Sequence, residues 1–358
     1  MHCSEGRKRP LSARSVPQWG HCHGPNYAAL AIPVRRVHDL RPLRPTRSAA
    51  ALWPPLARFI AAEERLGRVA EQRPATAFAY EFLRFGVKQA WACLFGGAMV
   101  ALIVGTHLWY PRGVALARYD FLFLAALAIQ VGMLAFKLET LEEAKVILVF
   151  HVVGTVMEVF KTDVGSWIYP EPSFFRVGGV PLFSGFMYAS IGSYIARAWR
   201  LFDFRFTRHP PLWALLLLGA AVYVNFFAHH FTLDIRAALF AVTVLMFGRA
   251  WIHFKVWRAH RRMPLLLGCF LAALFVWLAE NIGTITKTWL YPHQLAGWSW
   301  VSLGKLGSWY LLLIISYAMV AMINRPQEMD AEDAALAVKG ATAGAPLGAS
   351  PEPRILNR

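Results

Sequence analysis

Charged residues are scarce in this sequence, and their scarcity excludes an ordinary soluble domain. They make up 16% of the 358 residues, whereas a soluble globular chain carries about 25%. The deficit is concentrated between residues 85 and 323, where apolar blocks alternate with short charged clusters. Most blocks are close to the roughly 20 residues that a helix needs to cross a bilayer. The composition therefore predicts a membrane protein built of helices.

Several sequence motifs with a defined chemistry are also missing. The four cysteines show no paired spacing, and Cys93 and Cys269 fall inside apolar blocks, so we expect no disulfide framework. The sequence has no phosphate-binding loop, dinucleotide-binding fingerprint or zinc-protease motif. No pair of His or Glu residues has a persuasive ligand spacing. We therefore predict no metal site and no cofactor.

Positive charge dominates the little charge that is present. The net charge is +16, and residues 1–75 hold 13 Lys and Arg against 5 Asp and Glu. A basic tail can bind nucleic acid, but attraction to anionic headgroups at the cytoplasmic face of a bilayer is the simpler explanation. We therefore expect the lipid bilayer as a partner and no nucleic acid. Residues 1–57 are expected to be disordered, 58–86 to form an amphipathic lead-in helix, and 325–358 to form a flexible cytoplasmic tail.

Eight apolar blocks are candidate transmembrane helices. They cover residues 87–108, 119–137, 145–163, 179–197, 211–230, 235–253, 263–282 and 303–323. The third and sixth blocks are the weakest candidates, because the longest uncharged stretch in the middle of each has only 12 residues between two charged ones. If both termini are cytoplasmic, the inner loops and N-terminal flank hold 17 Lys and Arg and the outer segments hold 7. This bias agrees with the positive-inside rule and supports an even number of spans.

One short pattern occurs twice, 122 residues apart. Glu158 is followed nine residues later by Trp167-Ile168-Tyr169-Pro170, and Glu280 is followed nine residues later by Trp289-Leu290-Tyr291-Pro292. Taken singly, each Trp and Tyr is explained as an anchor at the headgroup level. The repetition with an acid at the same upstream distance is harder to explain in that way.

The repeated pattern extends beyond the aromatic residues and predicts the architecture. Thr162 and Thr284 also occupy matching positions. We therefore predict two tandem repeats of four helices each, residues 87–205 and 206–324, in parallel topology. The predicted fold is all-α: a polytopic membrane helix bundle of about eight transmembrane helices.

Both repeated acids are predicted to lie within the bilayer. Glu158 is 13 residues beyond Lys145, and Glu280 is 18 beyond Arg262; these spacings correspond to about 20 Å and 27 Å of helix. In a hydrocarbon core of about 30 Å, both carboxyl groups lie in its outer part. An ionised carboxylate there costs about 2.5 kcal/mol or more unless it is paired or wet. We therefore expect the two acids to face one partly wet cavity near the outer leaflet.

Neighbouring polar and aromatic residues complete a candidate site. Lys161 lies three residues after Glu158, so a local ion pair on one helix face is the simplest alternative explanation for that acid. No catalytic residue is assigned. The predicted intramembrane site comprises Glu158, Glu280, Lys161, His151, Asn281, Thr284, Trp167, Tyr169, Trp289 and Tyr291.

Several stretches of the sequence carry a family resemblance. They include residues 82–95, 136–139, Glu158-Val159-Phe160-Lys161-Thr162, 178–188 and Leu278-Ala279-Glu280-Asn281-Ile282-Gly283-Thr284. Together they resemble the YoaT-like family of bacterial integral membrane proteins, known as domain of unknown function 817, over about residues 80–325. The resemblance implies a multi-pass protein of the bacterial cytoplasmic (inner) membrane, and it implies no established activity.

A remoter similarity is to membrane proteins of the lycopene-cyclase type. Those proteins also carry a helix acid, a Gly-x-Trp-x-Tyr element and a Gly-x-Pro turn, which correspond here to Glu158, residues 165–169 and residues 179–181. The cyclase pattern places acids after that proline. This chain has Leu182, Phe183 and Ser184 there, so the expected proton donor is missing.

Three classes of function remain open. The intramembrane acids and repeat symmetry favour binding or transport of a small molecule. A membrane-embedded enzyme that modifies an isoprenoid or another lipid, with a Glu as general acid, is the second. A structural or accessory membrane protein, whose acids pair across helices, is the third.

Overall fold

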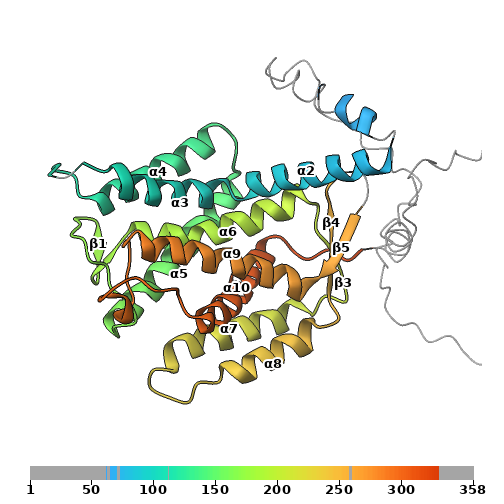
Figure 1. The fold of residues 1–358 in the computed structure, drawn as a ribbon. Coiled ribbons are helices and arrows are strands. Elements are labelled where there is room, and N and C mark those ends of the chain that lie inside the picture. The colour runs from blue at the N-terminus through green and yellow to red at the C-terminus, as the bar shows by residue number, and fades with distance from the viewer. Residues whose placement is uncertain (1–61, 63–64, 71–72, 112, 258–259, 330–358) are drawn as a thin grey trace, which may run out of the picture. The chain divides into compact units, whose positions relative to one another are not determined.

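The computed structural model describes residues 62, 65–70, 73–111, 113–257 and 260–329, and the prediction for residues 1–57 lies outside this part. The helices of Figure 1 are α2 (Pro74–Ala92), α3 (Leu94–Trp109), α4 (Arg118–Ala135), α5 (Leu141–Asp163), α6 (Phe183–Leu201), α7 (Leu212–Ala228), α8 (Arg236–Phe247), α9 (Leu265–Ile285) and α10 (Leu303–Ile323). The strands are β1 (Arg176–Val177), β2 (Val180–Pro181), β3 (Arg205–Thr207), β4 (Trp251–Lys255) and β5 (His260–Pro264), and η3 (Pro292–Gln294) is a 3₁₀ turn.

The described part is mostly helical, as predicted, but the number of membrane spans is not confirmed. Each of the eight apolar blocks overlaps a helix. By length and apolarity, however, α4, α9 and α10 are the described helices able to cross a membrane singly. The pair α2 and α3, bent by 69°, gives a fourth if it counts as one broken span. The structure therefore supports three to four spans, and the larger count stays a prediction.

The sixth predicted span is wrong in its second half. Helix α8 has 12 residues and ends at Phe247, so it is about 18 Å long against a hydrocarbon core of about 30 Å. The chain then enters β4, which pairs with β3 through Arg205 and His253 and with β5 through Trp251 and Pro264. Backbone hydrogen bonds in this three-stranded sheet replace those of a longer helix. The fold is therefore not all-α.

The predicted terminal segments also need correction. Residues 65–70 are helical, but the expected continuous helix over 58–86 is broken before α2. Helix α2 begins with a proline in its first turn, where the missing N–H is not needed, and continues past residue 86. At the other end, Gln327 and Met329 form backbone hydrogen bonds with Phe206 in β3. The tail predicted for 325–358 thus begins with a sheet contact.

Helix α6 is at the centre of the bundle and packs most extensively on α5. Glycines allow the close approach. A Cβ at Gly154 would lie 2.5 Å from the Cβ of Tyr188, and one at Gly192 would lie 2.7 Å from the ring of Phe150. Helices α2, α3, α4 and α10 also contact α6. This close packing fixes which side chains of α5 and α6 meet.

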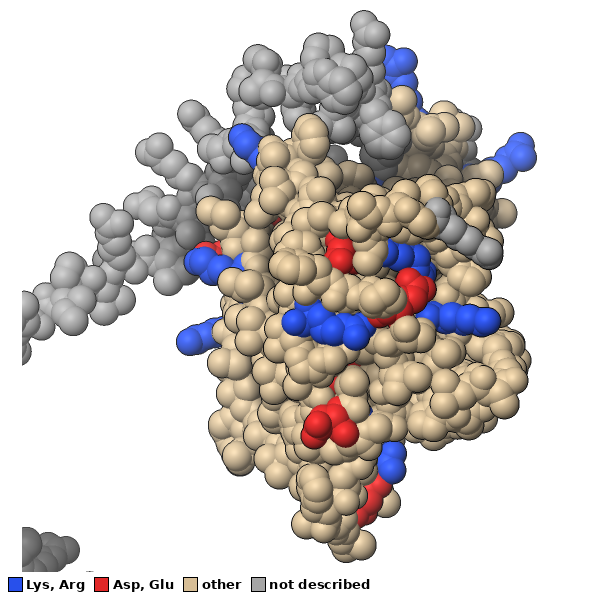
Figure 2. All heavy atoms as spheres, turned by 90° about the vertical axis from the view of Figure 1, so that its left-hand side faces the viewer, with Lys and Arg blue, Asp and Glu red and all other residues tan. Residues whose placement is uncertain are grey.

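Loops that were predicted to share one side of the membrane gather at one end of the bundle. The strands β3, β4 and β5 come from the predicted inner loops and lie at the right in Figure 1. The segments that follow α5 and α9, both predicted to be outer, lie at the left and contact each other. Figure 2 shows this second end, where charged side chains of both signs are surrounded by uncharged surface. The candidate site lies in this end.

Candidate functional site

Helices α5 and α9 end in the same local structure. Gly165 has φ +72° and Lys287 has φ +53°, so both positions are left-handed although one is not glycine. The next amide in each case donates to a carbonyl five residues back, at 2.8 Å after α5 and 2.9 Å after α9. This is the hydrogen-bond pattern of a helix C-cap with a left-handed residue. The two positions are 122 residues apart, which matches the sequence repeat.

The two Trp-x-Tyr-Pro segments lie against each other in an antiparallel β-bridge. Ile168 and Leu290 exchange two backbone hydrogen bonds, with N···O distances of 2.9 and 3.0 Å. The bridge brings the rings of Trp167 and Tyr291 edge to face, with their centroids 6.1 Å apart. The repeated elements are therefore joined into one structure, which places the residues upstream of them in the same neighbourhood.

Glu158 is buried and surrounded by hydrogen-bond donors. Its carboxyl oxygens accept bonds from Trp167 Nε1 at 2.7 Å, Tyr169 Oη at 2.6 Å and Tyr188 Oη at 2.7 Å. The residue is 5% exposed. The donors favour the ionised form of a carboxyl group and burial favours the neutral form. The carboxyl group thus lies out of contact with bulk solvent, and three aromatic donors supply its hydrogen bonds.

Glu280 is buried in the corresponding arrangement. It accepts hydrogen bonds from Tyr291 Oη and Trp309 Nε1, and it too is 5% exposed. Burial, reinforced by Glu280, raises the pKa of Tyr291 well above its usual range, so this hydroxyl stays a donor. The rings of Tyr188 and Trp309 have centroids 6.0 Å apart. The donors to both acids therefore form one aromatic cluster, which we call the paired-glutamate cluster.

A lysine that the sequence analysis did not select completes this cluster. Lys305, in the first turn of α10, places Nζ 4.6 Å from the ring centroid of Tyr291 and 5.3 Å from that of Trp167. Within the described part of the chain, Lys305 forms no ion pair or side-chain hydrogen bond. Its ammonium therefore rests on two aromatic faces, an arrangement stabilised by cation–π attraction.

Lys161 does not pair with Glu158, so the local ion-pair interpretation is wrong. Its Nζ donates to His230 Nε2 at 2.7 Å and lies 4.1 Å above the ring of Phe226. Burial, followed by the nearby Lys161, lowers the pKa of His230 and keeps that ring able to accept. In the same loop, the hydrogen bond from Arg236 lowers the pKa of Asp234 to about 2. The side chain of Lys161 thus contacts the end of α7 and the turn that follows it, and it does not contribute to the site around Glu158.

Asn281 and Thr284 support a neighbouring loop, and they do not contact either acid. Asn281 Oδ1 accepts from the amide of Val301 at 2.9 Å, and Thr284 Oγ1 accepts from Trp298 Nε1 at 3.1 Å. Both side chains hold the segment between α9 and α10 against α9. They contribute to the site indirectly, by fixing the loop that leads to Lys305.

Trp289 and His151 also lie outside the hydrogen-bonded cluster. Trp289 packs over Gly283, where no side chain would fit. His151 packs against Phe186 with the rings tilted and their centroids 4.4 Å apart, and its Nδ1 is buried with no hydrogen-bond partner among the described residues. Seven residues separate His151 from Glu158, which is about 10 Å along the helix. The structure therefore brings together Glu158, Glu280, Trp167, Tyr169 and Tyr291 from the predicted set.

A second buried polar cluster lies near the opposite end of the bundle. Arg197 Nη2 pairs with Glu139 Oε1 at 2.6 Å, and both side chains are 0% exposed. Ser193 Oγ donates to the same oxygen at 2.8 Å, and Gln130 Nε2 donates to the other at 2.6 Å. We call this the Arg197–Glu139 cluster. Its charges neutralise each other directly.

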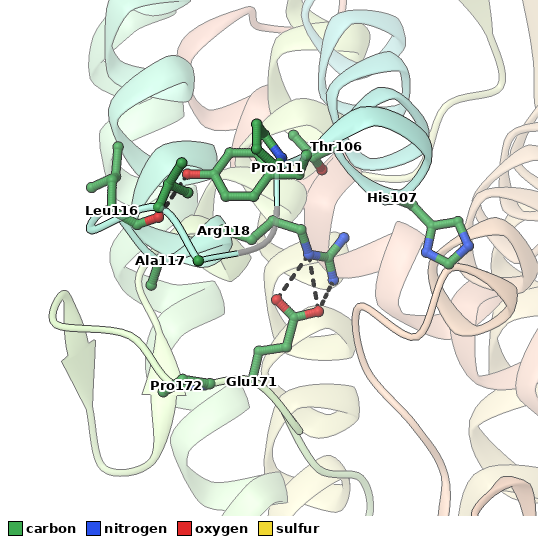
Figure 3. A pocket seen from close by; sticks show the side chains of 11 residues that line it. Thr106, His107, Pro111, Leu116, Ala117, Arg118, Glu171 and Pro172 are labelled. Atoms are coloured by element: carbon green, nitrogen blue, oxygen red, sulfur yellow. Dashed lines mark hydrogen bonds and ion pairs between the residues drawn. The ribbon is translucent and has the colours of Figure 1, made fainter.

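A surface hollow of about 320 Å³ lies at the same end as the paired-glutamate cluster. Figure 3 shows Arg118 among the residues that line it, with its guanidinium donating to both carboxylate oxygens of Glu171. His107 and Tyr110 also line it. The ion pair joins the start of α4 to the loop after α5, so it ties together two segments that were predicted to be outer.

The described residues offer no ligand set for a metal. No group of three or more His, Cys, Asp or Glu side chains among them is placed to hold a metal ion. The paired-glutamate cluster instead presents N–H and O–H donors and one ammonium to two carboxyl groups. Such an arrangement suits recognition of a charged or polar small molecule.

Comparisons with known proteins give a family and no activity. The family model described as "Protein of unknown function (DUF817)" matches residues 81–317. The chain belongs to this family. It is 42% identical over 248 residues to "Uncharacterized protein YoaT" of Bacillus subtilis (strain 168), a match that covers 69% of this chain and 93% of the relative. No solved structure matches.

The family match spans both polar clusters, yet the sequence revealed only part of the paired-glutamate cluster and did not predict the Arg197–Glu139 cluster. Tyr188 and Trp309 were missed because nothing in their local sequence distinguishes them from other aromatic residues of apolar helices. Lys305 had a usable signal, since it is the charged residue that precedes the apolar block 306–324.

Proposed function

We propose that this DUF817 protein binds a small molecule at the paired-glutamate cluster and transports it across the bacterial cytoplasmic membrane. The observation that carries the proposal is the pairing of two buried glutamates from segments 122 residues apart, each with its own aromatic donors. Burying two acids close together is unfavourable. The aromatic donors oppose this penalty, and a role of the two acids in binding a ligand would explain why both are placed there.

The position of the cluster within the bundle supports uptake of the molecule from the outer face of the membrane. The cluster lies at the end formed by segments that the positive-inside rule assigns to the outer face, so both termini are cytoplasmic in this proposal. Reporter fusions after Arg205 and after Arg262 are expected to report the cytoplasm, and fusions near Glu171 and Gln294 the outside. A cytoplasmic signal at Gln294 would overturn this orientation.

The central test removes each acid's charge while keeping its shape. A deletion strain is profiled for metabolites and lipids, then complemented with wild type, Glu158→Gln or Glu280→Gln. We expect both variants to insert at near wild-type levels and to fail to restore the profile. Glu142→Gln is the matched control, because Glu142 lies on the same helix α5 with its side chain 67% exposed.

The result also separates the remaining classes of function. Accumulation or loss of a small polar metabolite supports transport, whereas a changed isoprenoid or lipid pattern supports the enzyme. If both glutamine variants restore the profile, the acids are structural and the proposal is wrong.

A further inference from the structure

We propose that the paired-glutamate cluster is a site for a primary ammonium group, and that Lys305 fills it as a tethered competitor of the substrate. This inference rests on the proposed function and names the chemical class of the small molecule. An aromatic face and a carboxylate together are the usual means by which proteins recognise an organic cation.

The surroundings of Lys305 have the composition of an ammonium cage. Trp167 and Tyr291, which come from opposite copies of the repeated motif, each offer a ring face to Nζ. Burial disfavours the charged form of Lys305 and Glu280 opposes that effect, yet Glu280 forms no ion pair with Lys305 in the described part. The ammonium is therefore held by rings and long-range attraction alone, and a free amine could replace it.

The difference between the two repeat copies points to Glu280 as the ligand's partner. Position 183, which is 122 residues before Lys305, is Phe183. Its ring packs against Tyr169 with centroids 6.2 Å apart and is fully buried. Glu158 accepts three hydrogen bonds and Glu280 accepts two. The second copy thus has a cation where the first has a packed ring, and an acid with spare accepting capacity.

The charge balance of the cluster would favour the binding of one more cation. With both acids ionised, two negative charges face the single positive charge of Lys305, since Lys161 is directed to His230. An incoming ammonium would therefore meet negative charge that Lys305 alone does not compensate. It would compete with Lys305 for the rings.

The test replaces the tethered ammonium by a free one. Full-length Lys305→Met is purified in detergent, and its thermal unfolding is followed with n-butylammonium, whose four-carbon chain matches the lysine side chain. We expect a saturable rise in Tm on the order of 2 °C or more at concentrations well above Kd. n-Butanol is the uncharged control and is expected to give no saturable rise. The double variant Lys305→Met/Glu280→Gln is expected to lose the response.

The wild-type protein gives a second measurement if Lys305→Met does not fold. Butylammonium must displace the tethered lysine there, so a higher concentration is needed for the same rise, and Glu280→Gln should abolish it. Equal responses to butylammonium and butanol, or a response that survives Glu280→Gln, would overturn the proposal. If complementation by the glutamine variants fails but no amine binds, the proposed function stands with a ligand of another class. If amines bind but the glutamine variants complement, the cage exists without that function.

Discussion

The two buried polar clusters of this protein use similar residues in opposite ways. In the Arg197–Glu139 cluster, one guanidinium contacts one carboxylate at 2.6 Å, and both side chains are fully buried. In the paired-glutamate cluster, two carboxyl groups face neutral aromatic donors, and the nearest ammonium contacts rings. In the first arrangement the guanidinium and the carboxylate pair directly. In the second, neither carboxyl group forms an ion pair among the described residues, and this difference separates a structural cluster from a candidate binding site.

The largest effect is expected from breaking the satisfied pair. Arg197→Met leaves Glu139 buried without its cation, which costs about 3–5 kcal/mol. We expect a large fall in yield and Tm, measured in detergent. The double variant Glu139→Gln/Arg197→Met removes both charges and should recover much of the loss. A single variant as stable as wild type would show that this cluster is not structural.

The next largest loss of stability is expected from a substitution at Gly154, which packs closely against Tyr188. A Cβ at Gly154 would overlap the side chain of Tyr188, so Gly154→Ala is expected to cost about 1–3 kcal/mol and to withdraw the hydroxyl from Glu158. Both Tm and complementation should fall. Gly132→Ala in α4 is the control, because nothing lies within 4 Å of its added Cβ and alanine favours helix by up to about 1 kcal/mol. Equal behaviour of the two variants would contradict the packing argument.

Removing a single donor tests the aromatic cluster more gently. Tyr188→Phe deletes one hydrogen bond to the carboxyl of Glu158, and a typical hydrogen bond contributes a net of about 0.5–1.5 kcal/mol. Complementation is expected to weaken more than expression does. Tyr194→Phe, whose hydroxyl makes only a 3.4 Å contact with Gln89, should stay within about 0.5 kcal/mol of wild type. Indistinguishable variants would mean that the donor is dispensable.

The smallest effect is expected at the surface of α5. Lys145 and Glu142 form an ion pair with side chains that are 68% and 67% exposed. Lys145→Gln should change the free energy of unfolding by less than about 1 kcal/mol, because solvent and salt screen exposed pairs. A loss comparable to that of Arg197→Met would erase the contrast between buried and exposed charge in this protein.

The sequence predicted the helices well because apolar blocks and bilayer-length spacing are local signals. It failed at α8, since the pairing of β4 with β3 joins residues 44–48 positions apart and has no local signature. The same reason explains the missed contact between Phe206 and the segment after α10. Which helices actually cross a membrane also depends on burial within the bundle, and hydropathy does not report burial.

The candidate site was predicted where a repeated spacing existed and missed where it did not. The spacing of Glu158 and Glu280 to their tryptophan and tyrosine residues anticipated a shared neighbourhood. The direction of Lys161 could not be anticipated, because its partner, His230, lies on another helix end 69 residues away. Trp167 donates to an acid while Trp289 packs on Gly283, so matching residues in two copies need not share a role.

The β-bridge between Ile168 and Leu290 has a mechanical consequence. Its two hydrogen bonds, at 2.9 and 3.0 Å, break if the strands separate by about 1 Å, since such bonds extend to only about 3.2 Å. While the bridge is intact, the ends of α5 and α9 that carry it cannot separate, so the two Trp-x-Tyr-Pro segments must move together in any rearrangement of the bundle.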